Sequence, residues 1–333
     1  MTPAELSRTV RHAVCRAVED GVLRVPVPED IRVERPGPGG CGDWATTVAL
    51  RLARPAGIPP REVAALLRDR LTDAPGIASV DITGPGFLNI TLGGASQRDL
   101  VRRVRAEGVR YGQKEHPPVA PGPVTSRRAV WDETVRRLRA TQGAGRETAA
   151  QDPAQDPGRA AGSRGRTPAA PVEPAAIDAA LGTDALRWAL LHAAAHDRPR
   201  PGGHLLRQHE SNPLFTVRYA HSRTRALTRN AAALGFHGDP LKTVEPAGTS
   251  LDALIAEYPD ALATAARLHA PDRLVRHLEA TADAVLSFQH TVLPQGEEKP
   301  SAAHRSRLAL AEAAGTVLAG GLSLLGISAP EHL

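Results

Sequence analysis

The stretch Asn212-Pro-Leu-Phe-Thr-Val-Arg-Tyr-Ala-His-Ser-Arg223 opens the clearest helical pattern in this chain of 333 residues. From Val217 onward, small and apolar residues recur in alternating steps of three and four, which places them on one stripe of a helix. The members of this stripe are Val217, Ala220, Thr224, Leu227, Ala231 and Leu234. The pattern predicts a helix that begins near Pro213 and is ended by Gly235.

Helical patterns continue downstream of this first stripe. A second predicted helix begins at Leu251 and is expected to stop at Pro259, a third follows Pro271, and a fourth runs from Ser301. The connections are short, which is typical of antiparallel neighbours. Residues 177–333 are therefore predicted to form an all-α helix bundle.

The first 111 residues combine helical and extended patterns. The segments Ser79–Thr83 and Phe87–Leu92 are predicted strands joined by a turn at Gly84-Pro-Gly86. A third short strand is expected at Asp30–Glu34, and Asp43 is expected to cap a helix that runs through Ala53. These patterns predict a small amino-terminal α/β domain, so the fold class of the whole chain is α+β.

Residues 144–176 have a different composition, with five prolines, four glycines and ten alanines. Val172 is the only large aliphatic residue in this segment. Such a sequence cannot bury enough apolar area to offset the entropy lost on ordering it. We interpret residues 144–176 as a disordered, flexible linker between the two domains.

Charge and hydropathy limit the possible partners. The formal net charge is +5 and the isoelectric point is about 9.7, which permits a polyanionic partner. No apolar run approaches the roughly 20 residues that span a bilayer, and no signal peptide is evident at the amino terminus. The expectation is a cytoplasmic protein without a membrane partner.

Three motifs resemble those of one known family. The stretch 212–223 resembles the opening helix of the anticodon-binding domain of arginyl-tRNA synthetases, which is of the DALR type. Gly42-Asp-Trp-Ala-Thr-Thr-Val-Ala49 and Gly84-Pro-Gly-Phe-Leu-Asn89 resemble the two signatures of the amino-terminal tRNA-binding domain of the same family. The resemblance covers roughly residues 1–111 and 181–333, and it implies tRNA as a partner.

The catalytic domain of that family has no room in this sequence. Only 69 positions, 112 to 180, lie between Tyr111 and Leu181, and a two-halved nucleotide-binding fold needs several times the roughly 30 residues of one βαβ unit. The stretch from Pro121 to Thr141 is similar to the first catalytic loop and helix of the family, so we interpret residues 112–143 as a helical remnant of the catalytic region. Val124, Thr125 and Ser126 stand where the family has paired histidines, and no lysine lies in the family's lysine motif. The sequence predicts no catalytic residue and no cofactor.

Arginines on the 212–223 helix are the candidate anticodon-stem contacts. Arg218, Arg225 and Arg229 are separated by seven and four residues and share a face, while Arg223 lies to one side. Such a row can bind a phosphate backbone through bidentate hydrogen bonds, although a solvated helix face has the same pattern. Tyr219 matches an aromatic position of the family motif, where the alternative is a core residue.

The candidate contacts at the tRNA elbow are Phe87 and Asn89. The resemblance implies that they offer an aromatic face and an amide to a base of the D-loop. Because side chains alternate along a strand, both lie on one face and Leu88 lies on the other. The alternative for Phe87 is again a place in the core.

A histidine cluster raises the question of a metal site. His192, His196, His204 and His209 lie close together in the sequence, but no cysteine or paired carboxylate completes a ligand set. Arginines at positions 198, 200 and 207 would repel a cation, and the two cysteines, Cys15 and Cys41, are too few for a metal framework. The sequence predicts no metal.

The leading hypothesis is a non-catalytic relative of arginyl-tRNA synthetase that binds tRNA, with arginine tRNA as the expected partner. Two weak modules joined by a flexible tether gain affinity through effective concentration. The alternative is a protein-interaction scaffold or an accessory subunit that acts in trans with a complete arginyl-tRNA synthetase. Salt dependence distinguishes the two, because RNA binding through arginines weakens steeply as salt rises.

Overall fold

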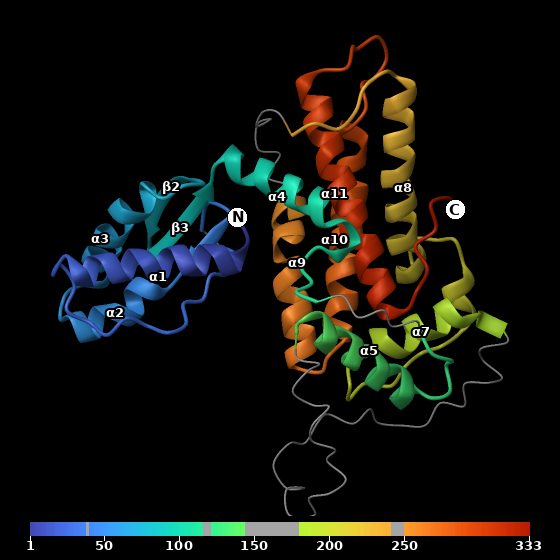
Figure 1. Ribbon diagram of the computed structural model, residues 1–333, viewed down its shortest axis with the longest axis horizontal. Coiled ribbons are helices and arrows are strands. Elements are labelled where there is room, and N and C mark those ends of the chain that lie inside the picture. Colours follow the sequence, from blue (N-terminus) through green and yellow to red (C-terminus); the bar gives the residue numbers. More distant parts are fainter. Residues whose placement is uncertain (38–39, 116–120, 144–179, 241–249) are drawn as a thin grey trace, which may run out of the picture. The chain divides into compact units, whose positions relative to one another are not determined.

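The computed structural model describes residues 1–37, 40–115, 121–143, 180–240 and 250–333 (Figure 1). The predicted linker, residues 144–176, lies outside the described residues. The chain divides into two compact units, of which the first takes residues 1–102 and the second takes 103–239 together with 250–333. The domain limits predicted from the sequence remain predictions.

The first unit is a three-stranded antiparallel sheet covered by helices. Its elements are α1 (Pro3–Glu19), β1 (Trp44–Thr46), α2 (Val48–Ala56), α3 (Pro60–Thr72), β2 (Ile77–Thr83) and β3 (Phe87–Leu92), followed by α4 (Gly94–Glu107), which continues into the second unit. The strand order is β1-β3-β2. Helix α3 packs against β2 and β3, α2 packs against β3, and α1 packs against α3 (Figure 1).

The pairing register gives this sheet one apolar and one polar face. Leu88 lies between Thr46 and Ile82, and Ile90 lies between Trp44 and Val80, so these six residues share the face that carries the core. The other face carries Ala45, Asp81, Thr83, Phe87 and Asn89. The alternation predicted for Phe87–Leu92 is therefore confirmed, and it sets the candidate elbow residues on the face opposite Leu88.

Two sequence predictions in this unit are wrong. Asp43 does not cap a helix; its backbone N–H donates to Ile90 O at 2.9 Å and its carboxylate accepts from Leu92 N at 2.7 Å, so the segment is held along β3 as strand β1. Gly42 permits this approach, with a φ of 78° and no room for a Cβ beside the Ile90 carbonyl. The expected strand at Asp30–Glu34 is reduced to a single bridge between Glu34 and Ala45.

The second unit is helical. Its helices are α5 (Arg127–Thr141), α7 (Thr183–His192), α8 (Pro213–Ala233), α9 (Ser250–Arg267), α10 (Asp272–Phe288) and α11 (Ala302–Leu325). Helix α10 packs against α8, α9 and α11, and α11 packs along α8, while α5 and α7 lie together at one end of this bundle (Figure 1). The small amino-terminal sheet domain and this bundle confirm the predicted α+β class.

Packing decides where these helices end. Helix α9 continues through Pro259 instead of stopping there, because its apolar stripe continues with Leu262, Ala265 and Ala266, all buried. That burial offsets the roughly 3 kcal/mol that a proline costs inside a helix. Leu234, expected on the buried stripe of α8, caps the helix and is 51% exposed.

Buried ion pairs and hydrogen bonds hold α5 in the second unit. Glu133 of α5 accepts from Arg187 of α7 at 2.8 Å and from Arg137, and the side chains of both arginines are almost fully buried. Arg137 also donates to Leu324 O of α11 at 2.8 Å. Burial alone would raise the pKa of Glu133, but the hydrogen bond and charge of Arg187 and the charge of Arg137 outweigh it and hold the pKa below its usual value. The helix interpreted as a catalytic remnant thus has a structural role in the bundle.

Helix α11 is apolar over 24 residues, with a mean hydropathy of 1.7 in its most apolar window. By length and composition alone it resembles a membrane span. However, 78% of that window is buried inside the bundle. It packs so closely on α8 that a Cβ at Gly315 would lie 2.2 Å from Thr224 Oγ1. We therefore interpret α11 as the core helix of the bundle.

Candidate nucleic-acid interface

The start of α8 is fixed by Asn212. Its Oδ1 accepts from the backbone N–H groups of Leu214 and Phe215, which makes it the N-cap of the helix. Its Nδ2 donates to the carbonyls of Leu205 at 2.7 Å and Arg207 at 2.9 Å. One buried side chain therefore holds both the helix terminus and the loop before it, so the surface between them is preorganised.

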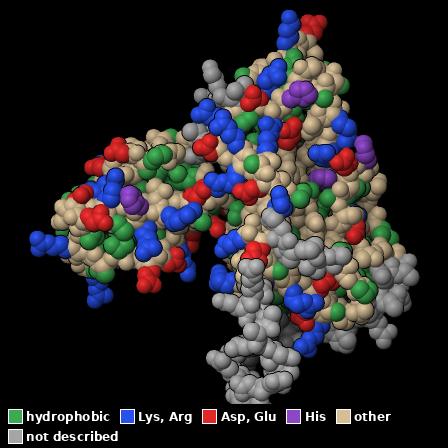
Figure 2. Space-filling model, in the orientation of Figure 1, with side chains coloured by type: hydrophobic (Ala, Val, Ile, Leu, Met, Phe, Trp, Pro, Cys, Tyr) green, Lys and Arg blue, Asp and Glu red, His purple; other side chains and the backbone are tan. Residues whose placement is uncertain are grey.

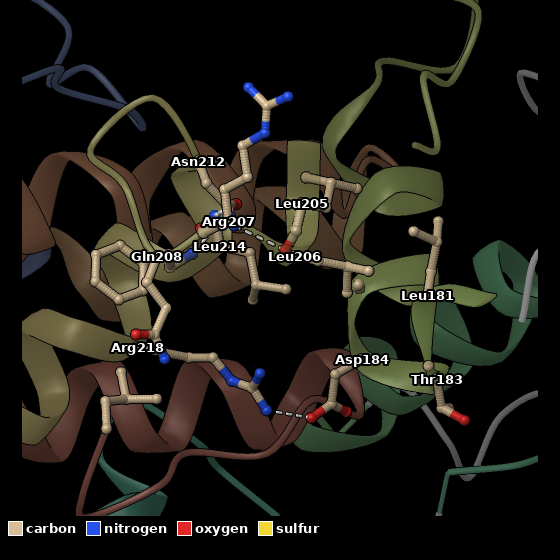
Figure 3. Close-up of a pocket in the computed structure, with 14 residues that line it drawn as sticks. Leu181, Thr183, Asp184, Leu205, Leu206, Arg207, Gln208, Asn212, Leu214 and Arg218 are labelled. Atoms are coloured by element: carbon tan, nitrogen blue, oxygen red, sulfur yellow. Dashed lines mark hydrogen bonds and ion pairs between the residues drawn. The ribbon is translucent and has the colours of Figure 1, made fainter. Parts of the chain in front are cut away.

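A pocket of about 480 Å³ lies beside this helix start (Figure 3). It is lined by the beginning of α7, the loop 205–212, the first turns of α8 and Leu333. Exposed Leu206, Arg207 and Gln208 border it, and the Arg207 side chain extends away from the Arg218–Asp184 pair in Figure 3. The pocket offers apolar surface with polar groups at its edge, as a site for an unstacked base requires.

Two aromatic rings stand next to this pocket. Phe215, which lines the pocket, and Tyr219, one helical turn later, stack with ring centroids 5.5 Å apart. Tyr219 is 36% exposed and Phe215 is partly exposed, so neither ring belongs to the buried core. The core alternative for Tyr219 does not hold, and the pair presents an aromatic surface.

Arg218 is engaged within the protein. It pairs with Asp184 of α7, a contact visible in Figure 3, and its Nε donates to Ser328 O at 3.2 Å. Asp184 also accepts from the backbone N–H and hydroxyl of Ser328. Arg218 thus joins α7, α8 and the segment after α11, and it also lines the pocket.

The other arginines of the row contact the same segment. Arg225 Nη2 donates to Glu331 Oε1 at 2.8 Å, and Arg229 Nη2 lies 3.4 Å from His332 Nδ1. Residues 328–332, which we call the tail, therefore run along the face of α8 that carries these arginines, beside the C-terminus marked in Figure 1. The prediction that Arg218, Arg225 and Arg229 share one face is confirmed, and each of these arginines has a partner in the tail, while Arg225 and Arg229 remain exposed.

Backbone contacts hold the tail in place. His221 Nδ1 lies 2.9 Å from the Pro330 carbonyl, and the Ser222 hydroxyl donates to Glu331 O at 3.2 Å. Burial lowers the pKa of His221, against the opposing effect of the Pro330 carbonyl, so the ring is neutral at pH 7 and donates through Nδ1. The sequence shows no periodic signal for these contacts, because an extended tail and a helix row meet only in three dimensions.

Arg223 lies to one side of the row, as predicted, and its Nε donates to Gln289 Oε1 at 2.7 Å. This contact ties α8 to the end of α10. All four candidate arginines thus have partners within the protein. A phosphate backbone would have to compete for them or use their remaining N–H groups.

In the first unit, the two candidate elbow residues differ in exposure. Phe87, at the start of β3, is 37% exposed, whereas Asn89 is 2% exposed and its Nδ2 donates to Thr83 Oγ1 at 2.7 Å. A Cβ at Gly40 would lie 3.1 Å from Asn89 Oδ1, so the loop before β1 covers this amide. Their role at an elbow remains a prediction, with Phe87 placed for direct stacking and Asn89 placed to support the β2–β3 hairpin.

Basic and acidic side chains are interspersed over the visible surface in Figure 2. The net charge of +5 is therefore not gathered on a single face in that view. Local contacts, rather than overall charge, must define an interface here.

Three of the four histidines considered for a metal have separate partners. His192 lies 3.1 Å from Glu279, His196 lies 3.5 Å from Asp197, and His209 bonds to Ser211. Among the residues that the structure describes, no group of three histidine, cysteine, aspartate or glutamate side chains could hold a metal ion.

The loop similar to the family's first catalytic loop leads into α5. Ser126 is the N-cap of that helix, and its hydroxyl accepts from Ala129 N at 3.1 Å. Val124 is buried. Within the described part of this loop, the side chains at positions 124 and 126 serve helix capping and packing.

Comparison with known proteins gives two family matches. Residues 4–92 match the family model described as arginyl tRNA synthetase N terminal domain, and residues 217–333 match the DALR anticodon binding domain. An arginine--tRNA ligase of Kineococcus radiotolerans is 51% identical over 120 residues, which cover 35% of this chain and 22% of that protein. The corresponding ligase of Renibacterium salmoninarum is 49% identical over 118 residues, covering 34% of this chain and 22% of that protein.

The matched stretch thus spans about 22% of the length of these curated relatives. A solved structure of Thermus thermophilus arginyl-tRNA synthetase aligns with a TM-score of 0.65 and 13% sequence identity over 100% of both chains, which supports the fold alone. The β3 hairpin and α8 from Val217 onward, with Tyr219 and the four candidate arginines, lie in matched regions, whereas Phe215 and the loop 205–212 lie before the second match. The chain therefore joins an arginyl-tRNA synthetase amino-terminal domain to a DALR anticodon-binding domain, which confirms the family resemblance expected from its motifs.

Proposed function

We propose that this protein is a non-catalytic, cytoplasmic tRNA-binding protein whose partner is arginine tRNA. The observation that carries the proposal is the exposed Phe215–Tyr219 stack beside the pocket at the start of α8. Unstacked bases of a single-stranded loop bind to such aromatic surfaces, and neighbouring polar groups contact their edges. The DALR match of residues 217–333 supports an anticodon loop as the source of those bases.

A second contact at the tRNA elbow is part of the same proposal. Phe87 is the exposed aromatic residue of the β3 hairpin, and it lies in the region matched to the amino-terminal domain of arginyl-tRNA synthetases. Each contact alone is small. Their connection through the chain raises the effective concentration of the second contact once the first has formed.

The proposed lack of catalysis rests on the segment between the two matched regions. Where the family has its first catalytic helix, α5 uses Glu133 and Arg137 for buried contacts with α7 and α11. The sequence there has no paired histidines and no lysine motif to bind a triphosphate. The proposed activity is therefore binding without aminoacylation.

The test combines binding and activity on the whole chain. Fluorescence anisotropy with arginine tRNA and with a non-cognate tRNA measures affinity, and an arginine-dependent ATP–pyrophosphate exchange assay measures activation. We expect tighter binding of arginine tRNA and no exchange. The Tyr219→Ala variant is expected to weaken binding by about 5- to 100-fold, because stacking of a base on an aromatic ring is worth about 1–3 kcal/mol.

The alternative, a scaffold or an accessory subunit that binds a complete arginyl-tRNA synthetase, is favoured by one observation. The tail contacts the arginine row of α8, and the carboxylates of Glu331 and of Asp184 in α7 neutralise part of the charge that RNA would use. This alternative predicts weak tRNA binding even at low salt and co-purification with a synthetase. A steep loss of tRNA affinity with rising salt contradicts it.

A further inference from the structure

A second pocket, of about 580 Å³, adjoins the pocket at the start of α8. Leu205 lines both pockets, so they are neighbours at the loop between α7 and α8. We call this second pocket the basic pocket and define it by Trp188, His192, Arg198, Arg200, His204 and Arg276.

The charges of the basic pocket are mainly positive. Arg198 and Arg200 are exposed and make no hydrogen bond or ion pair with another described residue. Arg276 is 57% exposed and pairs with Asp272 at 3.3 Å. The only acidic residue in the lining is Asp197, which lies beside His196. An uncompensated positive charge in a concave surface attracts an anion.

The side chains of the wall are mostly hydrogen-bond donors. Two free guanidinium groups offer forked N–H donors that match the oxygens of a phosphate. Trp188 also lines the pocket, and its Nε1 is a buried donor with no acceptor among the described residues. His204, exposed at the rim, has no hydrogen-bonded side-chain partner in the described structure. The ligand that suits this wall is rich in acceptors.

The loop that carries the free arginines is held in place. Arg127 of α5 is buried and donates to the carbonyls of Ala193, Ala194 and Asp197 at 3.0, 2.8 and 2.7 Å. Pro199, between the two exposed arginines, is buried and fixes its own backbone torsion. Less conformational entropy is lost on binding when the loop is already ordered.

A smaller pocket of about 290 Å³ extends the basic pocket along α10. The two share Asp197 and Arg276, and the smaller one adds His196, His269, Arg273 and the buried Asp272, which pairs with Arg276. His269 has a φ of 52°, the one positive value outside glycine among the described residues, at the turn that brings its side chain there. The two pockets together bring Arg198, Arg200, Arg273 and Arg276 to one groove.

We propose that this groove binds phosphate groups of the RNA backbone, with Arg198 and Arg200 as the main contacts. The inference deepens the proposed function, since it names a second subsite on the same helical unit. A strand whose bases lie at the Phe215–Tyr219 pair passes the shared wall at Leu205 and places its backbone in the groove.

The test compares the double variant R198Q/R200Q with the matched control R136Q/R267Q. The control removes the same charge from two other exposed arginines of the second unit that have no partner among the described residues. Affinity for a labelled tRNA is measured across a salt series. We expect the pocket variant to bind about tenfold more weakly at low salt and to lower the salt slope by about 1.5, since each lost phosphate contact accounts for about 0.7 to 0.9.

A second arm uses pyrophosphate, at constant ionic strength, followed by calorimetry and phosphorus NMR. Pyrophosphate binding that is lost in R198Q/R200Q supports the phosphate site even if the wild-type protein fails to bind tRNA, in which case only the proposed function is contradicted. If the wild-type protein binds tRNA, the pocket variant and the control bind it equally, and pyrophosphate does not bind, the groove is not a phosphate site. Binding of neither probe by the wild-type protein overturns both proposals.

Discussion

Arg225 of α8 and Glu331 of the tail, 106 residues apart in the sequence, form an ion pair of 2.8 Å. Arg225 is the middle member of the arginine row on α8. Both side chains are about half exposed. A surface pair of this kind contributes about 0 to 1 kcal/mol to stability. Because this ion pair contributes so little, a phosphate group can compete with the Glu331 carboxylate for Arg225.

The Glu331→Gln variant tests that competition. Removal of the carboxylate leaves the Arg225 guanidinium available to a phosphate, so we expect tRNA to bind about two- to fivefold more tightly, while the melting temperature changes little. The control is Glu297→Gln, which removes an exposed carboxylate with no partner among the described residues. Equal effects of the two variants would show that only net charge matters.

The Phe87→Ala variant tests the elbow contact. Since Phe87 is 37% exposed, its removal is expected to leave thermal stability nearly unchanged and to weaken tRNA binding by about 5- to 100-fold through lost stacking. Val22→Ala, at an exposed apolar residue of the same unit, serves as the control. Unchanged affinity in Phe87→Ala argues against stacking at this position.

The Asn89→Ala variant is expected to behave differently. It removes the buried hydrogen bond to Thr83 Oγ1, which should lower the free energy of unfolding by about 1 to 3 kcal/mol. Chemical denaturation measures this loss. Full stability in Asn89→Ala, together with weakened tRNA binding, would show that the amide contacts RNA directly.

The Glu133→Gln variant tests the buried charge cluster. Without the carboxylate, Arg137 and Arg187 remain buried with less compensation, so we expect a loss of about 3 to 5 kcal/mol in the free energy of unfolding. Asp132→Asn is the control, because Asp132 is exposed and lies 3.6 Å from Arg128. A similar loss in both variants contradicts the structural role of Glu133.

The same cluster predicts a dependence on pH. The pKa of Glu133 is lowered in the folded protein, so its contribution is present above the unfolded value of about 4.5 and is lost as pH falls through the folded pKa. The wild-type protein should therefore lose stability below about pH 4.5, and Glu133→Gln should lose less over that range. Denaturation curves at several acidic pH values measure the difference.

The pKa values of two histidines in the second unit are shifted in opposite directions. The hydrogen bond to Glu279 raises the pKa of His192, so its contribution to stability is present below about pH 6.5 and is lost as pH rises through the folded pKa. Burial lowers the pKa of His221, so its contribution is lost as pH falls below 6.5. NMR titration of the two imidazoles measures both, and a His221 that titrates above His192 contradicts the packing of the tail on α8.

Local sequence patterns predict much of this protein, because periodicity and turn residues report on structure within one element. The helix from Pro213, the strand Phe87–Leu92 and the turn at Gly84-Pro-Gly86 follow from such patterns, and the motifs indicated both family domains. Patterns failed where distant packing prevails: Asp43 joins β3 instead of capping a helix, and Pro259 stays inside α9.

The same distinction between local patterns and distant packing applies to the candidate site. The sequence by itself determined that Arg218, Arg225 and Arg229 share a helix face and that Phe87 and Asn89 share a strand face, since both follow from the geometry of a single element. Only the tertiary structure decided that the tail lies on those arginines, that Asn89 is buried and that Tyr219 is exposed. The tail contacts join residues about a hundred positions apart, and the loop at Gly40 that covers Asn89 comes from far upstream of β3, so no local pattern encodes such contacts.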